Sequence, residues 1–178
     1  MYVLASQLRN LPIVGLQTGQ EVGTVVRPLV RADSLEIPAL YCKIHGGRPE
    51  KRYVILMRDI RQHANDCVIV DSHEDIEEAR EIVRLQQAIK NDYDPINKLV
   101  VNEDGTRLGR VEDYTLNIGS YRIQKLYVHQ PFWRSILFHN LVIDRSQIID
   151  INTKQITVRD ASIKQLLPRH KVVPETTK

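Results

Sequence analysis

The chain has 178 residues, of which 42% are hydrophobic, and its formal net charge is +3. This length allows one ordinary domain or two small ones, and no stretch approaches the roughly 20 apolar residues that a membrane-spanning helix needs. The N-terminal residues lack the charged start, long apolar run and cleavage site of a signal peptide, so we expect a cytoplasmic protein. The small net charge permits contact with RNA or lipid headgroups without indicating either.

The first part of the chain has the pattern of short strands. Residues 11–15 lead into a polar turn, in which Gly19 supplies the positive φ that a tight hairpin requires. Gly23 lies inside the next strand, where a missing side chain marks a bulge, a sharp bend or a close approach of two backbones. Further strands are predicted over residues 37–44, 52–60 and 68–70. We assign residues 1–71 to a first, nearly all-β unit.

A single long helix is predicted over the connector, residues 72–94. Ser72 followed by Asp75 has the form of a capping box, and Asp94 before Pro95 stops the helix. Between these ends, apolar residues recur at helical spacing, at Ile76, Ala79, Ile82, Val83 and Ile89. This apolar stripe is expected to dock on a neighbouring unit or, if left free, to offer a dimer contact.

The residues after the connector repeat the first unit. An offset of 86 aligns Val14, Gly19, Gly23, Val25, Ile37, Leu40 and Tyr41 with Val100, Gly105, Gly109, Val111, Ile123, Leu126 and Tyr127. After a two-residue insertion, an offset of 88 aligns Val54, Ile55, Ile60 and Val70 with Val142, Ile143, Ile148 and Val158. A repeat of this length indicates a duplicated domain rather than a solenoid.

We assign residues 95–162 to the second unit. Its strands are expected over residues 98–101, 121–128, 137–149 and 156–158. A short helix is predicted over residues 161–167, with a basic tail after it. We assign residues 163–178 to this last part of the chain.

Each copy resembles a PRC-barrel domain, the small β-barrel named after the photosynthetic reaction centre. The resemblance rests on the opening turn with its two glycines, the long bent strand after it, and the closing apolar hairpin that ends in VIV (68–70) or ITV (156–158). It implies a mainly β fold, in which two small PRC-like β-barrels from an internal duplication are joined by one α-helix.

The resemblance implies docking rather than catalysis. Such barrels occur in the cytoplasmic subunit of the reaction centre, in the C-terminal half of a ribosome-maturation factor and in small proteins that act through partners. We therefore expect a non-enzymatic adaptor for protein partners, with a homo-oligomer left open. The alternative is a protein like the ribosome-maturation factor, binding ribosomal protein, rRNA or a ribosomal particle. A further alternative is peripheral contact with a membrane complex.

No catalytic residue, metal site or cofactor is predicted. Both G-x-x-x-G segments lie between strands and lack the Lys and Ser/Thr of a phosphate loop, so their glycines are structural. The six histidines show no paired metal-ligand spacing. Consecutive helical residues such as His73, Glu74 and Asp75 point about 100° apart and cannot converge on one ion.

The two cysteines, Cys42 and Cys67, are expected to be buried free thiols. His45 and His63 lie near them in sequence, and a catalytic dyad with either is the weaker interpretation. Two thiols in strand-like segments also fit a reducing compartment.

The candidate partner surface is in the second copy, at Tyr127, Phe132, Trp133 and Arg134. Aromatic residues and Arg are enriched in the parts of interfaces that carry most of the binding energy. The alternative is that these rings plug the barrel end or pack between the barrels. In the tail, Lys164, Arg169 and Lys171 could contact phosphates of RNA or lipid, or form an ordinary solvated terminus.

Overall fold

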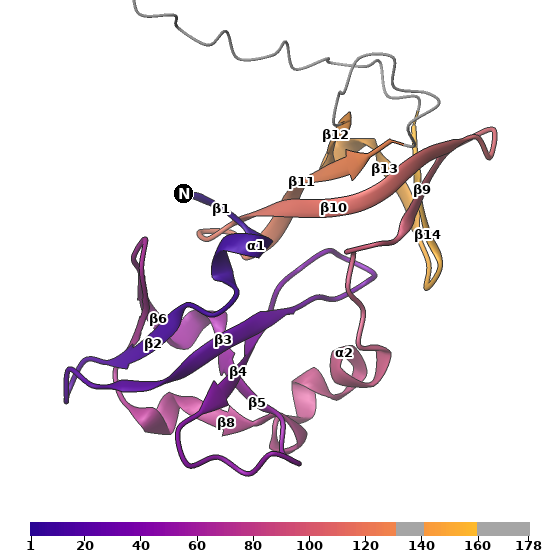
Figure 1. Cartoon of the computed structure of the whole chain (residues 1–178). Helices are drawn as coiled ribbons and strands as arrows, with labels where there is room; N and C mark the ends of the chain where they lie inside the picture. The colour runs from indigo at the N-terminus through magenta and orange to yellow at the C-terminus, as the bar shows by residue number, and fades with distance from the viewer. Residues whose placement is uncertain (131–140, 160–178) are drawn as a thin grey trace, which may run out of the picture.

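The computed structural model describes residues 1–130 and 141–159, which form two β-sheets, one in each half of the chain (Figure 1). The mainly β fold predicted from the sequence is confirmed. The N-terminal unit is a half-barrel and the C-terminal unit is the second barrel region. Several predictions lie outside the described residues: the helix over 161–167, Phe132, Trp133 and Arg134 of the partner surface, and the tail residues Lys164, Arg169 and Lys171.

The N-terminal sheet has seven strands in the order β6-β7-β2-β3-β4-β5-β8. They are β2 (Pro12–Gly15), β3 (Glu21–Leu29), β4 (Ala39–Ile44), β5 (Tyr53–Leu56), β6 (Ile60–His63), β7 (Val68–Val70) and β8 (Ile76–Glu78). A 3-10 turn, Met57–Asp59, turns the chain from β5 into β6.

The C-terminal sheet has the order β12-β11-β10-β9-β14-β13, with β1 (Tyr2–Leu4) from the start of the chain paired to β10. Its own strands are β9 (Leu99–Asn102), β10 (Arg107–Asn117), β11 (Arg122–His129), β12 (Leu141–Asp144), β13 (Ile148–Ile151) and β14 (Gln155–Val158). The 3-10 turn Arg145–Gln147 takes the place that Met57–Asp59 has in the other unit.

The two sheets repeat one another strand for strand, from β2 through β7 to β9 through β14, and in both the closing strand pairs in parallel with the opening one. Val25 pairs with Cys42 as Val111 pairs with Val128, and Tyr41 pairs with Val54 as Tyr127 pairs with Val142. The bulge that follows Val25 recurs after Val111. The predicted offsets of 86 and 88 are therefore structural equivalences.

The opening strand departs from the predicted alignment by one residue. Ile13 pairs with Gly23 and Val68, and Val100 pairs with their equivalents, Gly109 and Ile156. Val14 thus corresponds to Val101, and its predicted match to Val100 is wrong. The turn after the strand is one residue shorter in the second unit. An alignment anchored on the glycines is therefore displaced by one residue in the strand before the turn.

Gly23 and Gly109 lie where two backbones come into contact. A Cβ on Gly23 would lie 2.1 Å from the carbonyl oxygen of Lys43, and one on Gly109 would lie 2.2 Å from that of His129. No real side chain fits at such distances. Of the alternatives predicted for these glycines, the structure shows a close backbone approach, at equivalent positions of both units.

Unusual backbone conformations also recur at equivalent positions. Positive φ occurs at Gly19 and Gly105 (+66° and +77°), at Asn10 and Asn97 (+62° and +64°), and at Leu35 and Tyr121 (+54° and +53°). Asn tolerates this conformation. For Leu and Tyr it is unfavourable and requires support from the surrounding structure.

That support comes from the junction between the units. The backbone N–H of Ile37 donates to the carbonyl of Tyr121 (2.7 Å), and the N–H of Ile123 donates to that of Leu35 (3.0 Å). Since Leu35 corresponds to Tyr121 and Ile37 to Ile123, the contact has the reciprocal form of a twofold dimer interface, here within one chain.

The main core is continuous across this junction. Helix α1 (Ala5–Leu8) lies between the units and packs against β3 and β10 (Figure 1). Its Leu8 is fully buried in a cluster that also contains Ile13 and Val25 from one sheet and Val111 and Leu126 from the other. The two sheets therefore share one hydrophobic core.

The long helix predicted over the connector is wrong for most of its length. Residues 73–75 form a 3-10 turn and Ile76–Glu78 is strand β8. Further 3-10 turns at Ala79–Glu81 and Val83–Leu85 precede the single α-helix of the connector, α2 (Gln86–Asn91). The capping box is confirmed, because the Ser72 N–H donates to Asp75 Oδ2 (2.9 Å). It begins a single 3-10 turn, however, and not the predicted long helix. Pairing of β8 with β5 adds this segment to the first sheet.

Candidate docking surface

The connector packs on the outer face of the N-terminal sheet. Two rows of paired residues form this face, Leu29-Ala39-Leu56 and Arg27-Tyr41-Val54. Their apolar members form a second core with Ala79, Ile82, Leu85 and Ala88 of the connector. Next to this face, β8 completes the edge at β5. The N-terminal unit therefore binds a strand and the turns and helix after it, from its own chain.

The equivalent face of the C-terminal unit has a different composition. Where the connector covers Leu29, Ala39 and Leu56, this face has the row Thr115-Lys125-Asp144. The second row is Asp113-Tyr127-Val142, in which Tyr127 and Val142 are both partly exposed. Three positions that the connector covers in the N-terminal unit thus hold polar residues in the C-terminal unit. This indicates that the C-terminal face meets solvent.

The edge of the C-terminal sheet is open in the described part of the chain. There β12 pairs with β11 alone, whereas its counterpart β5 pairs with both β4 and β8. Unpaired N–H and C=O groups on such an edge are a template for another strand. Of the four residues predicted to bind partners, Tyr127 lies on β11 beside this edge.

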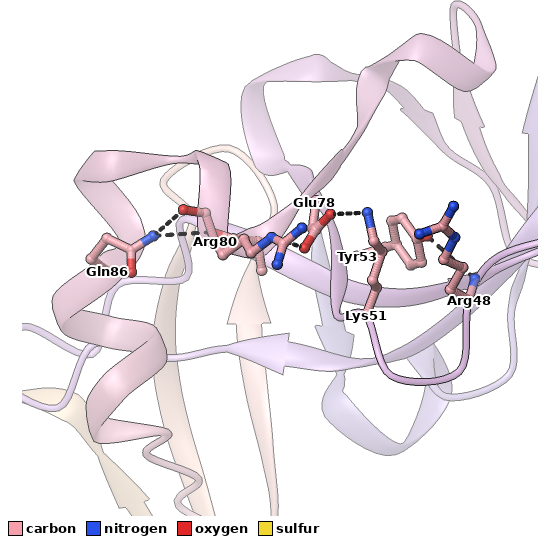
Figure 2. Close-up of polar contacts among 7 residues, drawn as sticks. Arg48, Lys51, Tyr53, Glu78, Arg80 and Gln86 are labelled. Carbon is pink, nitrogen blue, oxygen red and sulfur yellow. Dashed lines mark hydrogen bonds and ion pairs between the residues drawn. The ribbon is translucent and has the colours of Figure 1, made fainter.

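A cluster of charged and polar side chains fixes the connector to the N-terminal sheet (Figure 2). Glu78 on β8 is buried, accepts a hydrogen bond from Lys51 Nζ (2.5 Å) and forms an ion pair with Arg80. The Lys51 hydrogen bond is the main cause that lowers the pKa of the Glu78 carboxyl, against the opposing effect of burial. Gln86 Nε2 donates to the Arg80 carbonyl (2.7 Å), which joins α2 to the same cluster.

The cysteines show no activation. Burial raises the pKa of the Cys42 thiol to about 12, and burial together with the Asp66 carboxylate raises the pKa of Cys67. Both are free thiols, as expected, but only Cys42 is buried: Cys67 is partly exposed, so its predicted burial is wrong. Among the described residues no hydrogen bond joins a cysteine to a histidine, and His45 instead pairs with Glu21 (3.3 Å).

Metal-binding clusters and membrane-spanning helices are both absent from residues 1–130 and 141–159. No group of three His, Cys, Asp or Glu side chains there is placed to hold a metal ion. No helix in that part is long and apolar enough to span a membrane.

Comparison with known families bears on the C-terminal unit. Residues 89–164 match the model of the PRC-barrel domain. The chain thus contains one PRC-barrel domain. The match begins within α2 and takes in β9 to β14, so the sheet with the open edge at β12 is the PRC barrel. No curated protein matches the chain.

His63 is expected to make stability depend on pH. Neither ring nitrogen has a hydrogen-bond partner among the described residues, and burial lowers the pKa of the imidazole below its ordinary value. A lowered folded-state pKa means that the neutral ring is favoured in the native state. The stabilisation is present above the unfolded pKa of about 6.5 and is lost as pH falls below it.

The second unit provides the matched substitution, because Ile151 occupies the position of His63. His63→Ile is expected to raise the free energy of unfolding and to weaken its decline between about pH 7 and pH 5. Urea titrations across this range would measure both effects, with His45→Gln as an exposed control. A decline equal to that of the parent chain would contradict the assignment to His63.

Proposed function

We propose that the protein is a non-enzymatic, cytoplasmic adaptor in which both units are copies of the PRC barrel, and that it binds a protein partner on the C-terminal copy. The observation that carries the proposal is the contrast between the two units. One outer face and sheet edge are occupied by a segment of the chain itself, and the equivalent face and edge have no such cover from the described residues.

The occupied unit indicates what kind of partner fits. There, Ile76–Glu78 pairs with the sheet edge and the following turns place Ile82 and Leu85 on the outer face. Adding a strand to a sheet edge is a common way to bind an extended peptide, with main-chain hydrogen bonds giving affinity and side chains giving specificity. The proposed partner contributes an extended segment to β12 and apolar side chains to Tyr127 and Val142.

Tyr127 is the residue expected to contribute most to binding. Its ring is partly exposed and lies between Asp113 and Val142 in one row of the sheet. A Tyr at the centre of an interface loses a large apolar area to its partner while retaining a polar hydroxyl. Trp133 and its neighbours, on the segment that leads into β12, remain part of the proposed surface.

The raised thiol pKa values of Cys42 and Cys67 support the non-enzymatic part of the proposal, because the thiolate is the nucleophilic form.

The test is affinity capture from native lysate, with and without ribonuclease, comparing the parent chain with Tyr127→Ala and Trp133→Ala. Tyr2→Ala is the matched control, since Tyr2 is an exposed aromatic residue outside the proposed surface. Partners that survive ribonuclease should be retained by the control and reduced at least about tenfold by Tyr127→Ala, the usual effect of truncating a central interface residue.

Other outcomes would replace the proposal. Ribosomal components that disappear with ribonuclease would favour the ribosome-maturation alternative. Capture of membrane-complex subunits, or of a second copy of the chain, would identify those partners instead. Equal capture by the parent chain and Tyr127→Ala would show that the face on β11 and β12 is not the docking surface.

A further inference from the structure

A second surface, separate from the proposed docking face, lies on the N-terminal unit next to the end of α2. It is a cleft of about 240 Å³. Its charged lining consists of Arg27, Lys43, Lys51 and Arg52 with a single carboxylate, Asp92. Tyr53 forms part of the wall, and Figure 2 shows it close to Lys51. Four cationic side chains and one carboxylate line the cleft, and Glu78 pairs with Lys51 beside it, so the cleft keeps a net positive charge.

Two of the cations are committed to partners within the chain. Arg27 donates to Asp92 Oδ1 (2.5 Å) and lies 4.7 Å above the centre of the Tyr41 ring. Lys51 is bonded to the buried Glu78. These contacts fix the connector to the sheet and also fix the shape of the cleft.

The other two retain capacity to bind a ligand. Lys43 has no hydrogen-bond or ion-pair partner among the described residues. Arg52 contacts Asp92 through one nitrogen at 3.6 Å, and its side chain is 59% exposed. Arg52 also hydrogen-bonds the Tyr41 side chain, but its guanidinium has five N–H donors, so these two contacts leave donors for a ligand.

The positive charge is not a requirement of the fold. Arg27 corresponds to Asp113, and Lys43 corresponds to His129, at the same register positions of the C-terminal sheet. One copy therefore has an acid where the other has a guanidinium. A reversal at a matched position points to a role of this unit alone.

We propose that this cleft binds a small phosphomonoester, with the phosphate held by Lys43 and Arg52 and the attached ring or chain against Tyr53. Arg presents a fork of donors that matches phosphate geometry, and Lys adds a point charge. A phosphate dianion also offers more acceptors than a carboxylate to two cations that line the same cleft. The proposal does not depend on the adaptor function, because the cleft and the docking face belong to different units.

The test is an NMR titration of the full chain with phenyl phosphate and, in parallel, inorganic phosphate and sulfate at constant ionic strength. Saturable shifts at the amides of Lys43 and Arg52 are expected, and phenyl phosphate should bind more tightly than inorganic phosphate because it can contact Tyr53. The double variant Lys43→Gln/Arg52→Gln should weaken binding at least about tenfold. Lys154→Gln, an exposed lysine on the far hairpin, should bind as the parent does.

A further arm distinguishes the source of the phosphate. A phosphoserine peptide that binds more tightly than phenyl phosphate would assign the cleft to a phosphorylated protein, and weaker peptide binding would assign it to a free metabolite. The proposal is overturned if the shifts follow sulfate and phosphate equally, or if the double variant binds as the parent does while its spectrum shows a native fold.

Discussion

Gly23→Ala and Gly109→Ala are each expected to lower the free energy of unfolding by about 3 kcal/mol or more, a large loss for a single methyl group. The added Cβ would lie 2.1 Å from the Lys43 carbonyl oxygen in one unit and 2.2 Å from that of His129 in the other. Both obstacles are backbone atoms within a paired strand, so the sheet must open to admit the methyl. Chemical denaturation of each variant measures the loss.

Alanine substitutions at two other glycines serve as controls for this result. Gly19 has a positive φ of +66°, but no atom lies within 4 Å of the place that an added methyl would take. Gly19→Ala should therefore cost only about 1 kcal/mol, for backbone conformation alone. At Gly119 the nearest atom is 3.4 Å away, and Gly119→Ala should be nearly neutral. Equal losses for Gly119→Ala and Gly23→Ala would show that the close approach does not limit stability.

The same glycines explain why so much of the fold could be predicted from the sequence. A turn that needs positive φ favours Gly, and a close approach of two backbones that excludes Cβ requires it. Glycines therefore recur at the same spacing in both copies of the sequence. The paired apolar positions follow from alternation along the strands. Asn10 and Asn97 carry a similar signal, an Asn before each opening strand, which the alignment at offset 86 does not bring together.

The connector could not be predicted in the same way. Helical spacing of its apolar residues indicates one helix, yet Val83 is 85% exposed while Ala79, Ile82 and Leu85 are buried. Short 3-10 turns and a strand bury much the same residues as a helix would. The sheet decides between them, because the unpaired edge of β5 accepts β8 through backbone hydrogen bonds that local propensity does not include.

The candidate docking face is accessible to sequence reasoning only in part. Tyr127 is identifiable as an aromatic residue in a strand. The contrast of Leu29 with Thr115 and of Ala39 with Lys125 is visible once the repeats are aligned. The sequence does not reveal that the connector covers one of the two faces, since that depends on tertiary packing and not on periodicity.

Leu85→Ala is expected to destabilise both units, although Leu85 belongs to the second core of the N-terminal unit alone. Leu85 is fully buried, and truncating such a residue costs about 2–5 kcal/mol. Because the main core runs through both sheets and reciprocal hydrogen bonds join Leu35 and Ile37 to Tyr121 and Ile123, the units should unfold as one. Native-state hydrogen exchange should therefore show similar losses of protection in β3–β4 and in β10–β11.

The matched control is Val83→Ala, two residues away and exposed, which should leave protection unchanged in both sheets. If Leu85→Ala lowers protection in β3–β4 only, the units open independently and the junction acts as a hinge. Cooperative loss has a consequence for function, because it means that the cleft of one unit and the docking face of the other are held in a fixed relation. With that result, the proposed docking face and the proposed cleft form parts of one rigid body, and a partner that contacts both needs to order no hinge between them.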